Sequence, residues 1–305
     1  MSLILFIEQS LNGLQFGLML FLLASGLTLV FGIMDMINLA HGALYMVGAF
    51  FAAWLAQVTD SFVWGILLAV PLTALFGMVL EATLLRTLYA RDHLSQVLAT
   101  FSLILILNES VRMIWGSDLA FSAPAVLSGP VQLLPGLYYP SYRLVIIAVG
   151  LVLALLLYVA VTHTRVGALG RAGASNRDMA MAMGINIRAL FTAVFGVGAA
   201  LCAVAGAMLG PLLAVQVGMG ESILILAFVV IVIGGIGSIR GAFVGSLLVG
   251  FVDTFGRTLL PFLFREFLPP QWAAAAAPAV ASILIYVLMA VVLFVRPQGL
   301  FAARA

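Results

Sequence analysis

Three polar side chains, those of Asp35, Asn38 and His41, interrupt a long apolar stretch of the chain. Carboxylate, amide and imidazole groups can hold a polar solute or pass a proton, and a spacing of three residues would place them on one face of a helical turn. Such groups are tolerated at membrane depth only where protein or a water-filled cavity satisfies them. We therefore predict a broken helix over residues 32–42. Its polar side chains, together with Gly42, would line a pathway; a short loop at one membrane face is the alternative.

Glu221 is a second place where a charged group lacks a partner nearby in the sequence. It precedes the apolar run 222–236, and the positive end of a helix dipole favours a carboxylate at that position. Helix capping therefore competes with a role in the pathway, and we keep Glu221 as a candidate pathway residue.

Other charged residues in apolar runs have simpler explanations. Glu109 lies three residues before Arg112, and Asp253 lies four residues before Arg257. Both spacings place the two partners on one helix face. Glu81 comes near the end of an apolar run, so its side chain is expected to reach water. We predict structural roles for the two ion pairs.

A glycine-rich segment at 234–241 predicts a second break. It resembles a dinucleotide-binding loop only superficially, because it follows a membrane span and not a β-strand. Small residues that recur every four positions also let membrane helices approach closely. The glycines assigned to this break or to close packing are Gly234, Gly235, Gly237, Gly241 and Gly245. The same recurrence is found at Gly198, Cys202, Gly206 and Gly210.

Composition sets the class of protein. The 305 residues are 65% hydrophobic and 8% charged, with a mean hydropathy of +1.26, which is too apolar for a soluble domain. The basic residues are all arginine, so the lysine of a phosphate-binding loop is missing and ATP hydrolysis by this chain is not expected. The net charge of +2 argues against nucleic acid, and a single cysteine gives neither a disulfide framework nor a metal site. We expect no cofactor and no catalytic residue.

Nine apolar runs approach the roughly 20 residues that a membrane helix needs. They lie at about 10–33, 42–58, 62–85, 96–115, 144–162, 189–213, 222–236, 242–259 and 278–295. The fold class is therefore all-α, a polytopic membrane helical bundle of about eight or nine spans. Broken or re-entrant helices are expected near 32–42 and 234–241, and residues 1–305 form a single domain.

Arginine placement orients the bundle. Loops 86–93 and 163–188 and the C-terminal tail are rich in arginine and are assigned to the cytoplasmic side. Segment 116–143 faces the other side, where its four prolines favour extended or turn structure over helix. That segment would either seat a soluble partner or cap the bundle.

The cytoplasmic loop 163–188 contains a short predicted helix at 174–184. Ser175 or the asparagine after it can cap the start, and a glycine suits the end. Met179 and Met183 fall on one face, and methionine favours adaptable contact surfaces. We predict that this helix enters a groove on another protein; lying on lipid headgroups is the alternative. The residues assigned to the contact are Asn176, Arg177, Asp178, Met179, Met183 and Gly184.

Four stretches, 31–49, 164–186, 233–242 and 296–300, resemble the LivH-type permeases of ATP-binding-cassette importers for branched-chain amino acids. They cover the chain nearly end to end, and the element Asn-x-Ala-His-Gly in the first is quite specific. Two departures stand out. Ala43 occupies a position where many relatives carry glutamate, and the cytoplasmic loop lacks the glutamate of the broader Glu-Ala-Ala importer pattern.

The resemblance implies a pathway shared with a second, LivM-like permease subunit in the lipid of the bacterial inner membrane. It also implies two ATP-binding-cassette ATPase subunits, on which 174–184 docks as the coupling helix, and a periplasmic substrate-binding protein. Leucine, isoleucine and valine are the implied substrates.

The rival function is a self-contained secondary transporter or channel for a small polar or zwitterionic solute, with Asp35 and His41 as a proton relay. The chain has no run of intramembrane carboxylates, and this function leaves the cytoplasmic helix unexplained. A membrane enzyme is disfavoured further, because neither His-Glu-x-x-His nor Gly-x-Ser-x-Gly occurs in the sequence.

Overall fold

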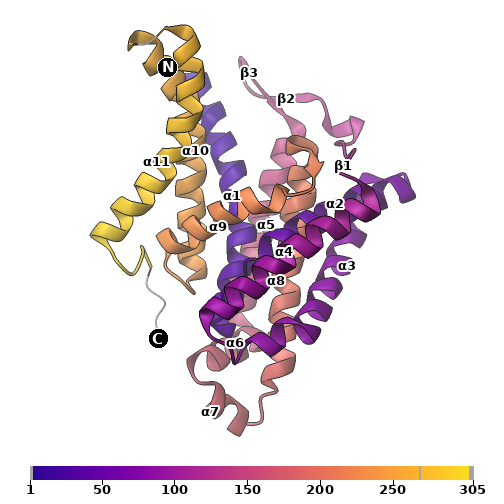
Figure 1. Ribbon diagram of the computed structural model, residues 1–305. Coiled ribbons are helices and arrows are strands. Elements are labelled where there is room, and N and C mark those ends of the chain that lie inside the picture. The colour runs from indigo at the N-terminus through magenta and orange to yellow at the C-terminus, as the bar shows by residue number, and fades with distance from the viewer. Residues whose placement is uncertain (1–2, 268, 302–305) are drawn as a thin grey trace.

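The computed structural model describes residues 3–267 and 269–301, and the chain is mostly helical within them (Figure 1). Nine helices coincide with the nine apolar runs, and eight of these are long and apolar enough to cross a membrane. They are α1 (Leu3–Met34), α2 (His41–Thr59), α3 (Phe62–Thr83), α4 (His93–Trp115), α5 (Ser141–His163), α8 (Ile187–Leu213), α9 (Met219–Gly234), α10 (Ile239–Phe267) and α11 (Pro270–Val295). Only α9, with 16 residues, falls short. The predicted all-α bundle of eight or nine spans is confirmed.

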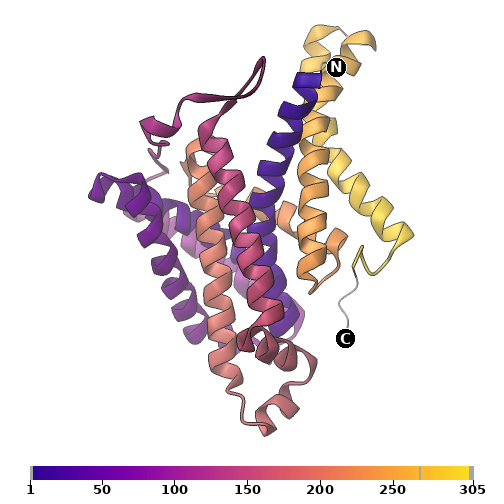
Figure 2. The ribbon, with the colours of Figure 1, turned by 180° about the vertical axis from the view of Figure 1, so that it is seen from behind.

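The short elements lie at the two ends of the bundle (Figures 1 and 2). At one end β1 (Asp118–Leu119) pairs with β4 (Val215–Gln216), and β2 (Pro130–Leu134) pairs with β3 (Leu137–Pro140), both antiparallel, near η2 (Ala125–Leu127). At the other end lie η1 (Leu85–Leu88), α6 (Arg165–Ser175) and α7 (Arg177–Ala182). The extended and turn structure predicted for 116–143 is confirmed.

Helix α1 lies at the centre of the bundle and packs against α5, α8, α9 and α10. Its middle is fully buried, with Leu20 and Leu22 at 0% exposure. Glycine brings α10 close: a Cβ added at Gly250 would lie 2.6 Å from the carbonyl oxygen of Gly13 and 2.7 Å from the Cα of Gly17. Lipid is as apolar as the side chains, so close packing of this kind holds membrane helices together.

The other small-residue positions pack in the same way. A Cβ added at Gly206 of α8 would press into the carbonyl oxygen of Tyr45 on α2. One added at Gly245 of α10 would lie 2.8 Å from the carbonyl oxygen of Val230 on α9. The predicted close approach of helices at the glycine recurrences is therefore confirmed.

The first break separates α1 from α2. The backbone of Asp35, directly after α1, is left-handed with φ of 49°, and α2 begins at His41. Between them, the Oδ1 of Asn38 accepts a hydrogen bond from the N–H of Ala40 at 3.0 Å, a local turn bond typical of asparagine. The break is confirmed, but the expectation that its polar side chains share one face is wrong. Asp35 is exposed, whereas Asn38 and His41 are fully buried.

The second break separates α9 from α10. Gly235 and Gly237 have φ of 102° and 80°, conformations that cost glycine little. The N–H groups of Leu300 and Phe301 donate to the carbonyl oxygens of the last two residues of α9, at 2.9 and 3.0 Å. The C-terminal segment thus caps α9, whose final carbonyls have no partner within the helix. The predicted second break is confirmed.

The two breaks meet through α9, which runs across the bundle (Figure 1). A Cβ added at Gly32, near the end of α1, would lie 3.0 Å from the Cα of Gly237. At its start, α9 packs through Gly220 against Gly42 of α2. One short helix therefore bridges the helices on both sides of the first break.

Candidate functional site

A shallow depression lies where α2 and α9 both begin, beside α4. The residues lining it are Leu39, Gly42, Ala43, Ile104, Asn108, Gly220, Glu221 and Leu224. Two of the predicted pathway residues, Gly42 and Glu221, are among them. The break after α1 allows α2 to begin beside the start of α9, and this brings Gly42 and Glu221 together.

Glycine is required where α2 and α9 cross. A Cβ added at Gly42 would lie 2.5 Å from the carbonyl oxygen of Gly220 and 2.8 Å from the Cβ of Leu224. A Cβ added at Gly220 would press into the carbonyl oxygen of Gly42. Neither helix has a side-chain cap at its start. The backbones of α2 and α9 are therefore in direct contact beside the depression.

Glu221 supplies the charge in this depression. Its Oε1 accepts a hydrogen bond from the Nδ2 of Asn108 on α4 at 2.8 Å; Glu221 is exposed and Asn108 is half-buried. The sequence showed no partner for Glu221 because the two residues are 113 positions apart. Asn108 is a site residue that sequence reasoning missed; an amide in the apolar run of α4 was the available signal.

His41 and Asn38 support the break from within the core and do not line the depression. Both side chains are fully buried. The Nε2 of His41 lies 3.0 Å from the Sγ of Cys202, and the imidazole is so tightly held that a Cβ at Gly26 would approach Nε2 to 2.8 Å. Asp35 is exposed at the end of α1. The structure thus separates the three polar residues that the sequence placed together.

Helix α7 projects from the arginine-rich end of the bundle (Figure 1). The side chain of Asn176 caps it by accepting from the N–H of Met179 at 2.9 Å, and Gly184 follows it with φ of 85°, as predicted. Ser175 instead ends α6, and α7 has six residues rather than two turns. Its two methionines and its C-cap residue, Met183, are exposed: Met179 at 60%, Met181 at 52% and Met183 at 78%. Asp178 lies in its first turn.

Arg177 differs from the rest of α7 because it faces the protein. Its Nη2 donates to the carbonyl oxygen of Met34, the last residue of α1, at 2.6 Å. Its guanidinium carbon lies 5.3 Å from the centre of the Phe191 ring on α8. The sequence grouped Arg177 with the outward contact residues, whereas the structure places it on this chain's own helices.

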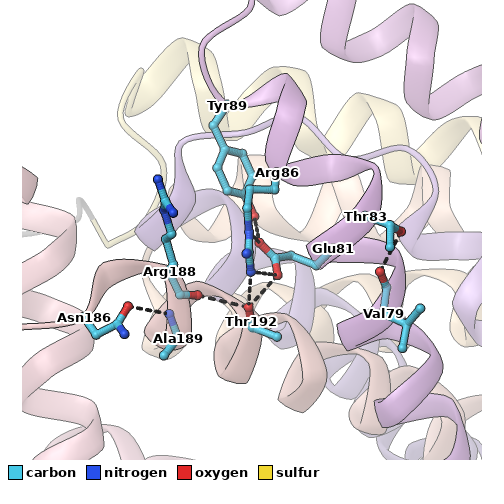
Figure 3. Close-up of polar contacts among 9 residues, drawn as sticks. All are labelled: Val79, Glu81, Thr83, Arg86, Tyr89, Asn186, Arg188, Ala189 and Thr192. Carbon is cyan, nitrogen blue, oxygen red and sulfur yellow. Dashed lines mark hydrogen bonds and ion pairs between the residues drawn. The ribbon is translucent and has the colours of Figure 1, made fainter.

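A polar cluster at the end of α3 is formed by Glu81, Arg86, Tyr89 and Thr192 (Figure 3). The spacing of residues in the sequence did not predict it. Glu81 is fully buried, so the expectation that it reaches water is wrong. Its carboxylate accepts hydrogen bonds from Arg86 at 3.1 Å, Tyr89 at 2.5 Å and Thr192 at 2.6 Å. Burial, followed by this carboxylate, raises the pKa of Tyr89, so its hydroxyl stays protonated and donates. Because Thr192 belongs to α8, the cluster fastens the end of α3 to the start of α8.

Glu81→Ala is expected to lower the free energy of unfolding by about 2 kcal/mol, because three donors lose their acceptor. The side chain of Arg86 is 35% exposed and can recover water, which limits the loss. The control is Glu109→Ala, since the ion pair of Glu109 with Arg112 is exposed on both sides and is worth less than about 1 kcal/mol. Thermal unfolding of the purified variants in one detergent measures both changes. Equal decreases in unfolding temperature for the two variants would show that the cluster stabilises the fold no more than an exposed ion pair does.

Within the described residues, eight membrane-length apolar helices and two helix breaks, the first of them beside a depression that carries Glu221, are typical of a polytopic membrane transport protein. Broken helices are used in this way because irregular backbone at membrane depth is tolerated where it lines a cavity. The family model for the permease component of branched-chain amino acid transport systems matches residues 9–293. The chain belongs to this family, and it is a multi-pass protein of the inner membrane.

Individual relatives match over most of their length. The chain is similar to the high-affinity branched-chain amino acid transport system permease protein BraD of Pseudomonas aeruginosa, with 29% identity over 97% of this chain and 95% of the relative. It is similar to LivH of Escherichia coli, with 28% identity over the same shares of each chain. A probable LivH of Methanocaldococcus jannaschii matches 77% of this chain at 28% identity. No solved structure matches.

Proposed function

We propose that this chain forms part of the substrate pathway of an importer for branched-chain amino acids, and that ATPase subunits on the cytoplasmic side drive it. The observation that carries the proposal is α7, a capped helix at the arginine-rich end that presents three exposed methionines, two within it and one at its C-cap. The rival function, a self-contained transporter, leaves this projecting helix unexplained. Methionine-rich surfaces suit docking, because the side chain is flexible and polarisable.

The remaining partners follow from the resemblance and from the full-length match to permease components. A second, LivM-like permease would complete the pathway within the membrane. Two ATPases would bind at the arginine-rich end, and a periplasmic binding protein would deliver substrate to the end that carries β2 and β3. Lipid would surround the exposed apolar faces of the outer helices.

The depression at the starts of α2 and α9 is the proposed contact with substrate. A branched-chain amino acid carries one ammonium, one carboxylate and an apolar side chain. The carboxylate of Glu221, oriented by Asn108, suits the ammonium group. Leu39, Ile104 and Leu224 suit the apolar part.

Glu221→Gln tests this assignment in vesicles that contain the assembled transporter, with radiolabelled leucine as the probe. Leucine uptake below saturation is expected to fall by about tenfold, the order expected when a charge-assisted hydrogen bond is lost. Glutamine keeps the shape and can still pair with Asn108, so folding is preserved. Glu109→Gln is the control, because it neutralises a carboxylate that pairs with Arg112 outside the depression. Unchanged uptake in the Glu221 variant would remove the depression from the pathway.

A further inference from the structure

Helix α7 is anchored to the bundle by an inward-facing cation. The guanidinium of Arg177 bonds the carbonyl oxygen of Met34 at 2.6 Å and stacks over Phe191. The exposed methionines lie on the same helix. One short helix thus carries both an outward contact surface and an inward connection.

The bond to Met34 is made at the point where the first break begins. The last carbonyls of a helix have no partner within it, and a cation is favoured there by the helix dipole. The next residue, Asp35, has a left-handed backbone, and the irregular segment then runs through Leu39 to the depression. Holding the Met34 carbonyl therefore fixes the start of the segment that ends at the substrate contact.

The second contact of Arg177 leads to the polar cluster on α3. The Phe191 ring meets the ring of Tyr89 edge-on, with centroids 5.5 Å apart and planes at 82°. The hydroxyl of Tyr89 in turn donates to Glu81. Contacts therefore connect α7 to the end of α1 directly and to the end of α3 through Phe191 and Tyr89.

We propose that Arg177 is a positioning residue that transmits the displacement of α7 to the first helix break, and through it to the depression. The proposal rests on the proposed function, in which an ATPase moves α7. It separates two roles within the helix: the methionines bind the partner, and Arg177 moves this chain's own backbone. Loss of Arg177 therefore uncouples ATP hydrolysis from transport without releasing the ATPase.

The test compares Arg177→Gln with Arg188→Gln in the assembled transporter with its binding protein. Arg188 is exposed in the first turn of α8, and within the described residues its guanidinium makes no hydrogen bond or ion pair (Figure 3). Three quantities are measured in one preparation: ATPase co-purification, leucine-stimulated ATP hydrolysis and leucine transported per ATP. For the Arg177 variant, ATPase binding and hydrolysis stay within about twofold, while transport per ATP falls by about tenfold. The Arg188 variant keeps all three within about twofold, because an exposed charge contributes little.

A second variant distinguishes a loss of coupling from a folding defect. Phe191→Leu keeps apolar bulk and the hydrogen bond to Met34 but removes the aromatic face under the guanidinium. It is expected to lower transport per ATP in the same direction by a smaller factor. Because leucine transported per ATP is a ratio, a smaller amount of folded complex alone leaves it unchanged.

The outcomes separate the two proposals. Unchanged transport per ATP in both the Arg177 and the Phe191 variants would show that the contact is only structural. Loss of the ATPase from the Arg177 variant would make that residue part of the docking surface, which overturns the inference and leaves the proposed function standing. A wild-type chain that binds no ATPase at all would overturn the proposed function, and this inference with it.

Discussion

Replacing Met179 and Met183 by aspartate is expected to release the ATPase proposed to dock on α7 from an otherwise folded permease. Both side chains are more than half exposed in this chain, at 60% and 78%, so the fold does not depend on them. Burying a methionine in a partner's groove contributes about 1.5–3 kcal/mol, and a carboxylate placed there also carries a desolvation cost. The two changes together should weaken binding by about a hundredfold or more.

Co-purification of the ATPase with the variant measures the effect directly, with leucine-stimulated hydrolysis in the same preparation. Val126→Asp serves as the control, since Val126 is 91% exposed at the opposite end of the bundle. The competing model, in which α7 lies on lipid headgroups, gives a different result. There the ATPase stays bound in detergent and in neutral lipid, and only contact with anionic lipid weakens. Normal co-purification and stimulation in both media would remove the main support for the importer function.

The second large effect is expected from a single methyl group where α2 and α9 cross. Gly42→Ala would place a Cβ 2.5 Å from the carbonyl oxygen of Gly220, which is backbone and cannot rotate away. Overpacking of this kind costs about 1–3 kcal/mol. Here the two helices must also separate, and both line the depression. We therefore expect a lower unfolding temperature together with a severe loss of leucine uptake.

Gly129→Ala is the matched control, because nothing lies within 4 Å of a Cβ added at that position. Gly220→Ala should reproduce the defect from the other helix, since it closes the same contact. Wild-type uptake and an unchanged unfolding temperature in the Gly42 variant would mean that α2 and α9 do not need this close approach.

Local patterns in the sequence determined the class of fold and the places where the helices stop. Apolar runs of membrane length predicted the spans, because hydrophobic length is set by the bilayer. Glycine and polar residues predicted both breaks, since Gly235 and Gly237 adopt a positive φ that other residues resist. Spacing also predicted the ion pairs of Glu109 and Asp253, which form within one helix.

The tertiary structure alone decided which polar groups meet. The bond between Asn108 and Glu221 joins residues 113 positions apart, and that between Arg177 and Met34 joins residues 143 apart. Glu81 appeared able to reach water, yet α8 covers it with Thr192. Spacing along one helix shows only neighbours on that helix. The partners of these groups depend on which helices the glycine contacts bring together, and that arrangement exists only once the bundle has packed.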